Sequence, residues 1–346
     1  MPDKFELQKT PTDTLGRAIQ DLRISVTDRC NFRCNYCMPA EVYGESYKFL
    51  PKTDLLNFDE ITRITSLFKE LGVKKVRITG GEPLVRNGVE KLIAMLSNTI
   101  GIQDLTLTTN GYLLAKKASQ LKSSGLKRVT ISLDSLDNEV FQQMNGRNVN
   151  TEPILSGIRE AERVGLSPIK INCVVQKGIN DHTIVDLAQH FKGTGHIVRF
   201  IEFMDVGNLN NWGMEKVVSR KEIFEMINSK FPLVPLSSNY RGEVASRYRY
   251  KDDSGEIGII TSVTDPFCDT CTRARLTTDG SLVTCLFASN GFDLRGPMRA
   301  GATDNELRDM IIKVWDKRTD QYSKERFKIR NSKTPIHKVE MYQIGG

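Results

Sequence analysis

Hydrophobic and polar residues alternate in six short segments within the first two hundred residues. These segments are predicted strands, at 22–27, 76–81, 105–111, 129–134, 169–175 and 197–203. Between them, apolar residues recur at three- and four-residue steps, as at Ile61, Ile64, Phe68 and Leu71 before Gly72, which predicts amphipathic helices. Alternating strands and helices predict parallel strands joined by right-handed crossovers.

The polar face of each strand decides between an open sheet and a barrel. Strands of a doubly wound sheet are covered on both faces and are continuously apolar. Here Arg23 and Ser25 alternate with Leu22 and Ile24, and the other strands show a similar pattern. If helical crossovers cover the apolar face of these strands, the polar face must line the interior of a barrel. Residues 14–204 are therefore predicted to form an α/β fold, a partial (β/α)6 TIM-like barrel with its site at the C-terminal strand ends.

The alternation ends near residue 204. Residues 205–213 are predicted to be a loop that could close over a ligand, and 205–346 to be a smaller C-terminal region. Within it, Thr303 and Glu306 have capping-box spacing and predict the start of a helix.

The composition of the 346 residues, 39% hydrophobic and 26% charged, is typical of a soluble protein. The N-terminal segment resembles no secretory signal and no run of eighteen apolar residues occurs, so we expect a cytoplasmic protein without a membrane span. The net charge of +7 is spread along the chain, which argues against nucleic acid as a partner. The sequence leaves a monomer and a homodimer open.

Seven cysteines fall into groups of three, one and three. In a reducing compartment disulfides are rare. A structural zinc ion usually takes four ligands, whereas three thiolates on a four-iron cluster leave one iron open to another ligand. For the first group this favours an iron–sulfur cluster, with zinc as the alternative; for the last group a structural zinc ion stays open. Cys173, on an apolar strand face, is expected to be a buried structural thiol. The triplets are Cys30, Cys34 and Cys37, and Cys268, Cys271 and Cys285.

Four cations fall on polar strand faces: Arg23, Arg77, Lys170 and Arg199. Such cations would repel one another inside a barrel unless an anion lay between them. Arginine suits phosphate oxygens, so a triphosphate is the expected ligand.

The stretch "CNFRCNYC" has the C-x3-C-x2-C spacing of the radical S-adenosylmethionine (SAM) enzymes, and "TGGEP" is similar to their second motif. Together with "CDTCTRARLTTDG", "RFIEFMDVG" and the terminal "GG", these stretches resemble the GTP 3′,8-cyclase family from about residue 14 to residue 346. That family carries out the first step of molybdenum cofactor biosynthesis.

The resemblance implies two [4Fe–4S] clusters, one on each triplet, and SAM as cofactor. It implies that the adenosyl radical removes the hydrogen at C3′ of GTP, and that the resulting carbon radical attacks C8 of guanine. It implies SAM contacts at Tyr36, Gly81, Ser132 and Met204. It implies GTP contacts at Arg23, Arg77, Thr108, Lys170, Arg273, Ala274 and Arg275. Arg23, Arg273 and Arg275 are the expected catalytic residues, with Arg199 a further cation for the substrate.

By the same resemblance, the terminal Gly345-Gly346 reaches the active site. The implied partners are a flavodoxin-like or ferredoxin-like electron donor and the cyclic pyranopterin monophosphate synthase that acts next. Two rival functions stay open: a two-cluster radical enzyme that modifies a peptide or tRNA, and a zinc-stabilised nucleic-acid-binding module.

Overall fold

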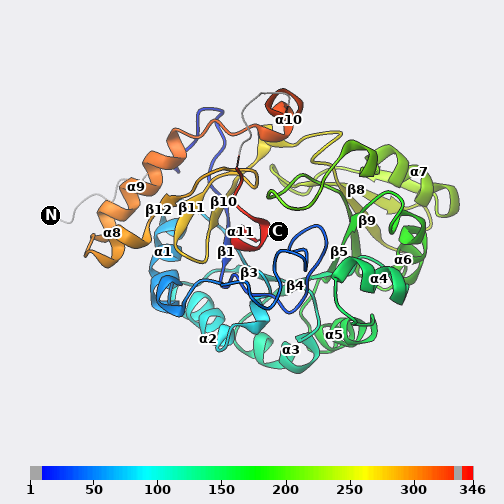
Figure 1. The fold of residues 1–346 in the computed structure, drawn as a ribbon, viewed down its shortest axis with the longest axis horizontal. Coiled ribbons are helices and arrows are strands. Elements are labelled where there is room, and N and C mark those ends of the chain that lie inside the picture. The colour runs from blue at the N-terminus through cyan, green and yellow to red at the C-terminus, as the bar shows by residue number, and fades with distance from the viewer. Residues whose placement is uncertain (1–9, 331–336, 346) are drawn as a thin grey trace.

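Six parallel strands form the centre of the fold in the computed structural model, which describes residues 10–330 and 337–345 (Figure 1). They pair in chain order, each with the next. The partial barrel predicted from the sequence is therefore confirmed, with strand boundaries that differ by up to two residues. The six strands are β1 (Asp21–Ser25), β2 (Lys75–Thr79), β3 (Asp104–Thr109), β4 (Arg128–Ser132), β5 (Lys170–Val175) and β6 (Ile197–Glu202).

Helices cover the outer face of this curved sheet, as Figure 1 shows. The loop between β1 and the first helix is long and contains the first cysteine triplet. The covering helices are α1 (Phe58–Glu70), α2 (Val89–Ala94), α3 (Leu114–Ser123), α4 (Asn138–Asn145), α5 (Glu152–Arg163) and α6 (Ile184–Phe191). Helix α2 is short, and a π-helical turn, Met95–Thr99, follows it directly.

The C-terminal part of the chain extends the same sheet at both edges. One added strand, β10 (Arg273–Leu276), pairs with β1, and β9 (Glu256–Ile260) pairs with β6, both in parallel. The full order is β12-β11-β10-β1-β2-β3-β4-β5-β6-β9-β8-β7. The outer strands are antiparallel: β7 (Leu233–Leu236), β8 (Ala245–Tyr250), β11 (Ser281–Val283) and β12 (Phe292–Asp293).

Strand alternation separates an apolar layer from a polar one. Leu22, Ile24, Val76 and Ile78 are fully buried in the layer between the strands and the outer helices. Burying this apolar surface is the main favourable contribution to folding. The residues between them face inward, where the register sets three arginines side by side: Arg275 opposite Arg23, and Arg23 opposite Arg77.

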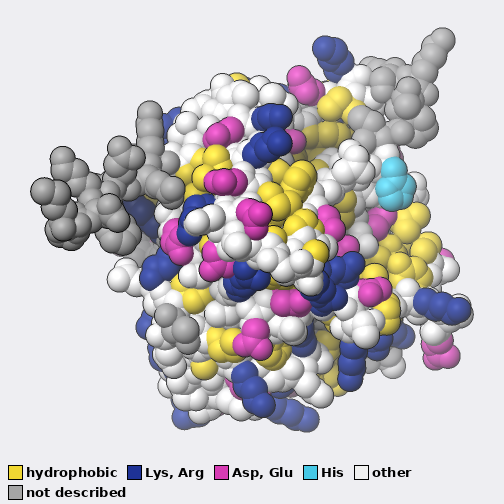
Figure 2. Space-filling model, turned by 90° about the vertical axis from the view of Figure 1, so that its left-hand side faces the viewer, with side chains coloured by type: hydrophobic (Ala, Val, Ile, Leu, Met, Phe, Trp, Pro, Cys, Tyr) yellow, Lys and Arg dark blue, Asp and Glu magenta, His cyan; other side chains and the backbone are white. Residues whose placement is uncertain are grey.

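Of the remaining helices, α7 (Arg220–Lys230), α8 (Arg295–Arg299), α9 (Asp304–Asp316) and α10 (Tyr322–Arg330) lie outside the six central strands, and α11 (Met341–Ile344) contacts β1. Helix α9 begins at the predicted capping box of Thr303 and Glu306. Basic and acidic side chains are interspersed on the face that carries α8 and α9 (Figure 2). Within residues 10–330 and 337–345, the helices are too short or too polar to span a bilayer.

Candidate active site

A single cavity at the C-terminal ends of the strands is lined by both cysteine triplets. Residues from β1 to β6 reach it from one side, and residues of the C-terminal region from the other. All seven cysteines are unpaired thiols. Nowhere in the described structure do three His, Cys, Asp or Glu side chains form a group suited to one metal ion. Iron–sulfur clusters are held by cysteine thiolates, and thiols of both triplets line this cavity.

The first triplet lies on a loop that Arg33 holds in shape. Its guanidinium donates hydrogen bonds to the carbonyl oxygens of Cys30 (2.8 Å), Phe32 (2.8 Å) and Tyr43 (2.6 Å). Burial, followed by the Glu82 carboxylate, raises the pKa of Cys30 to about 12. A cluster that binds here must therefore displace the thiol protons, as thiolate ligation requires.

Glycine 81 allows two loops to cross beside the first triplet. A Cβ added to Gly81 would overlap the carbonyl oxygen of Arg29, just before Cys30. The backbone amides of Gly81 and Glu82 donate to Thr27 O (2.7 Å) and Arg29 O (2.9 Å). Backbone hydrogen bonds from the "TGGEP" stretch thus hold residues 27–29, which lead into the cysteine loop, in position.

Two buried carboxyl groups border this part of the cavity, and neither was predicted as a site residue. Glu82 accepts hydrogen bonds from Thr109, Leu84 and Asn110, and burial raises its pKa to about 7. Asp134 accepts from the Tyr36 hydroxyl at 2.9 Å, and burial raises its pKa to about 6. Both carboxyl groups follow the C-terminal end of a strand, where barrel sites lie, and this position could have identified them from the sequence.

The second triplet comes from two segments. Cys268 begins a 3-10 turn, Cys268–Thr270, and Cys271 follows that turn just before β10, whereas Cys285 lies just after β11. Two guanidinium groups donate to the sulfur of Cys271, Arg273 at 3.1 Å and Arg318 at 3.2 Å. Burial would raise the pKa of Cys271, but these two cations outweigh it and lower the pKa to about 6. Burial raises the pKa of Cys285 to about 12, with Asp320 adding to the effect.

Guanidinium groups line the cavity between the triplets. Burial, followed by repulsion from Arg275 and Arg77, holds the pKa of Arg23 well below its ordinary value. In the described structure, the buried Nε atoms of Arg23, Arg77 and Arg273 lack hydrogen-bond partners. Buried charges are normally paired, so this arrangement suits an anionic ligand.

Most of the predicted site residues line this cavity. The structure brings together the six triplet cysteines with Arg23, Tyr36, Arg77, Gly81, Thr108, Ser132, Arg199, Met204, Arg273 and Arg275. Two predicted residues do not line it. Ala274 is fully buried in the apolar layer, and Lys170 lies in a smaller adjoining cavity, which Arg199 also lines. Burial lowers the pKa of Lys170 to about 7, with Arg199 adding to the effect.

The C-terminal segment packs inside the barrel, where α11 is drawn in red in Figure 1. Arg275 donates hydrogen bonds to the carbonyl oxygens of Ile344 (3.2 Å) and Gly345. Met341 lines the cavity. Gly346, the last residue of the predicted active-site tail, lies outside the described residues.

The comparisons with known proteins first define a class. Residues 24–191 match the family model "Radical SAM superfamily". The fold is similar to that of a solved structure titled "Crystal structure of Streptococcus suis SuiB bound to S-adenosylmethionine", with a TM-score of 0.57 and 16% identity over 91% of this chain and 69% of that one. The class is thus the radical SAM proteins, which carry a [4Fe–4S] cluster and use SAM.

The family-model match of the C-terminal region and the relatives that match nearly the full length identify one family within this class. Residues 196–324 match the family model "Molybdenum Cofactor Synthesis C". Proteins named GTP 3′,8-cyclase are 50% identical to this chain in Staphylococcus saprophyticus, over 97% of the chain and 98% of the relative, and in Staphylococcus carnosus, over 98% and 99%. The chain belongs to the GTP 3′,8-cyclase family.

Proposed function

We propose that each cysteine triplet holds a [4Fe–4S] cluster and that GTP binds between them. The reaction is the one that gives the family its name, the conversion of GTP to (8S)-3′,8-cyclo-7,8-dihydroguanosine 5′-triphosphate, the first step of molybdenum cofactor biosynthesis. The observation that supports the site assignment is that two three-thiol groups face one cavity, which is also lined by arginines whose buried Nε atoms lack hydrogen-bond partners within the described residues.

The chain's own groups have separate roles in this proposal. When bound, the first cluster supplies the electron that cleaves SAM into methionine and a 5′-deoxyadenosyl radical. Cys30, Cys34 and Cys37 hold that cluster, and the residues expected to position SAM beside it line the same part of the cavity: Tyr36, Gly81, Ser132 and Met204.

The second triplet and the arginines hold the substrate. Cys268, Cys271 and Cys285 would hold the second cluster, which would supply a binding site for the guanine base. Arg23, Arg77 and Arg275 lie side by side on neighbouring strands. Their guanidinium groups offer paired N–H donors to phosphate oxygens. Lys170 and Arg199 extend this positive region into the adjoining cavity.

Replacing each triplet with alanine tests the assignment. Iron and acid-labile sulfide are measured in anaerobically purified protein, and 5′-deoxyadenosine and the cyclic product are measured after incubation with GTP, SAM and a reductant. Each triple variant is expected to lose about four irons and the cyclic product. Cys173→Ala is the control, because Cys173 is buried among apolar side chains; it should keep full iron.

Two results would contradict the proposal: full iron content after loss of Cys268, Cys271 and Cys285, or 5′-deoxyadenosine formation that does not depend on GTP. We also propose that the reductant is a flavodoxin-like or ferredoxin-like protein and that the product passes to cyclic pyranopterin monophosphate synthase. Replacing the chemical reductant with each electron carrier in the same assay tests the first of these partners.

A further inference from the structure

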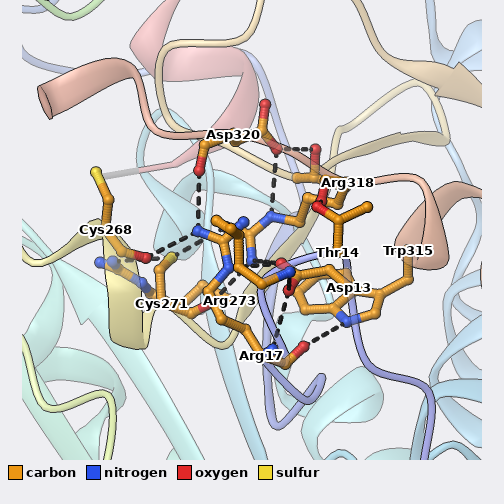
Figure 3. Close-up of polar contacts among 11 residues, drawn as sticks. Asp13, Thr14, Arg17, Cys268, Cys271, Arg273, Trp315, Arg318 and Asp320 are labelled. Carbon is orange, nitrogen blue, oxygen red and sulfur yellow. Dashed lines mark hydrogen bonds and ion pairs between the residues drawn. The ribbon is translucent and has the colours of Figure 1, made fainter. Parts of the chain in front are cut away.

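A buried network of charges lies directly behind the second cysteine triplet (Figure 3). Its fully buried members are Asp13, Arg17 and Arg318, whose side chains are at most 1% exposed. Asp320, whose side chain is 30% exposed, also accepts from Nε of Arg318 at 3.2 Å. Asp13 and Arg17 come from a turn near the N-terminus, and Arg318 follows α9. Burying three charges is costly unless each is paired and hydrogen-bonded, so a precise arrangement is needed here.

The two oxygens of Asp13 have different partners. Oδ1 accepts hydrogen bonds from the backbone amides of Leu15 (3.0 Å) and Arg17 (2.9 Å), which shapes the turn. Oδ2 accepts from Nε of Arg17 (2.5 Å) and from Nη1 of Arg318 (3.1 Å). One oxygen therefore serves the local fold and the other holds the two guanidinium groups.

Both guanidinium groups reach the loop of the second triplet. Arg318 donates to the Cys271 carbonyl oxygen (2.8 Å) and to the Cys271 sulfur (3.2 Å). Arg17 donates to the Cys268 carbonyl oxygen (2.8 Å). The guanidinium carbon of Arg318 also lies 4.7 Å from the centre of the Trp315 ring. Arg318 borders the cavity, whereas Asp13 does not line it.

Hydrogen bonds to cysteine sulfur and nearby positive charge raise the reduction potential of an iron–sulfur cluster, because reduction adds a negative charge. The Cys271 sulfur receives two such bonds, from Arg273 and Arg318.

We propose that Asp13 is a positioning residue for the second cluster: its Oδ2 holds Arg318 against the Cys271 sulfur and so keeps the reduction potential of that cluster high. This inference rests on the proposed function, which assigns a cluster to this triplet. Asp13 acts through Arg318 and touches neither the substrate nor the cluster.

The substitution Asp13→Asn separates positioning from simple charge. An amide keeps an acceptor at the Oδ1 position, so the turn is preserved, but it places a donor opposite the donors of Arg17 and Arg318. If Asp13 acted only as a nearby negative charge, its loss would raise the potential. If it positions Arg318, the loss of the N–H to sulfur bond lowers the potential.

The experiment uses the full chain with Cys30, Cys34 and Cys37 changed to alanine, so that only the second cluster contributes to the signal. Redox titration is followed by electron paramagnetic resonance of the reduced cluster. In Asp13→Asn we expect the reduced-to-oxidised ratio at a fixed potential to fall about tenfold, a shift of about 59 mV for one electron. The matched control is Asp104→Asn, which breaks an Asp–Arg pair with Arg128 outside the cavity and should leave the potential unchanged.

An unchanged or raised potential in Asp13→Asn overturns the inference. If Asp13→Asn loses its iron, Arg318→Lys decides instead. A lysine keeps the charge, but its ammonium cannot bind Asp13, the Cys271 carbonyl and the Cys271 sulfur in the geometry of a guanidinium. A potential equal to that of the protein with Arg318 intact would then overturn the inference. Absence of iron from the triple-alanine protein with Asp13 intact is a separate result, which would refute the second cluster itself.

Discussion

Replacing Asp205 with alanine tests how strongly one buried carboxylate ties the end of the chain to the barrel. Asp205 lies shortly after β6, and its side chain is 3% exposed. It accepts hydrogen bonds from Arg326 Nε (2.8 Å), Tyr322 Oη (2.5 Å) and Lys338 Nζ (2.9 Å). Arg326 itself is fully buried.

Loss of the carboxylate leaves the Arg326 and Lys338 cations without their counter-ion. Removing one partner of a buried ion pair costs about 3–5 kcal/mol, and we expect Asp205→Ala to lose that much free energy of unfolding. Urea denaturation followed by tryptophan fluorescence is a suitable assay, because the ring of Trp212 lies 5.9 Å from the Arg326 guanidinium. The control is Asp265→Ala, which removes an exposed pair with Arg220 and should cost less than about 1 kcal/mol.

The pH dependence gives a second test of the same residue. Burial raises the pKa of Asp205, but Arg326, Tyr322 and Lys338 outweigh burial and hold the pKa below its ordinary value. The contribution of Asp205 to the free energy of unfolding is therefore complete above the unfolded-state pKa of about 3.9. It is lost as the pH falls through the lower folded-state pKa. The stability difference between the two proteins should shrink only in acid. A loss below about 0.5 kcal/mol at neutral pH, or a difference that grows in acid, would refute the reasoning.

Three further changes have expected outcomes. Gly146→Ala places a Cβ against the Arg33 carbonyl oxygen at a residue with a φ of +63°, so we expect iron to be lost from the first triplet while the second keeps its iron; iron analysis checks this. Arg23→Ala is expected to weaken GTP binding by about 1.5–3 kcal/mol, measured by equilibrium binding. The same change should leave the apoprotein's free energy of unfolding unchanged or higher, because repulsion from neighbouring arginines is relieved. Trp315→Phe removes the buried hydrogen bond to the Arg17 carbonyl oxygen (2.9 Å) and should cost about 1–3 kcal/mol in thermal or urea unfolding.

The barrel and its polar interior could be predicted because they repeat a local rule. Alternation within a strand places Arg23 and Arg77 on one face and Leu22 and Val76 on the other, and each strand carries this information in a few consecutive residues. The grouping of the cysteines in the sequence likewise singled out the six thiols that line the cavity, while their role as cluster ligands stays a prediction. The domain boundary near residue 204 and the roles of individual site residues stay predictions.

Features that depend on distant partners could not be predicted in this way. The pairing of β10 with β1 joins residues about 250 positions apart, and nothing in "RARL" indicates which edge it joins. The contact of Asp13 with Arg318 spans 305 positions, and each residue alone resembles an ordinary surface charge. Lys170 shares its strand face with cavity residues but lies at the first position of β5. Alternation shows which face a residue is on, but not how far along the strand it lies from the C-terminal end where the site is.

The attachment of the C-terminal region to both edges of the barrel has a consequence for synthesis on the ribosome. When residue 204 has been made, β1 and β6 each still have one side without a hydrogen-bonding neighbour, and those neighbours arrive only with residues 256–260 and 273–276. At about 5–20 residues per second, the nascent barrel spends several seconds with two open strand edges, which are sites for aggregation. Chaperone dependence of the nascent chain should therefore end only after β10 has emerged.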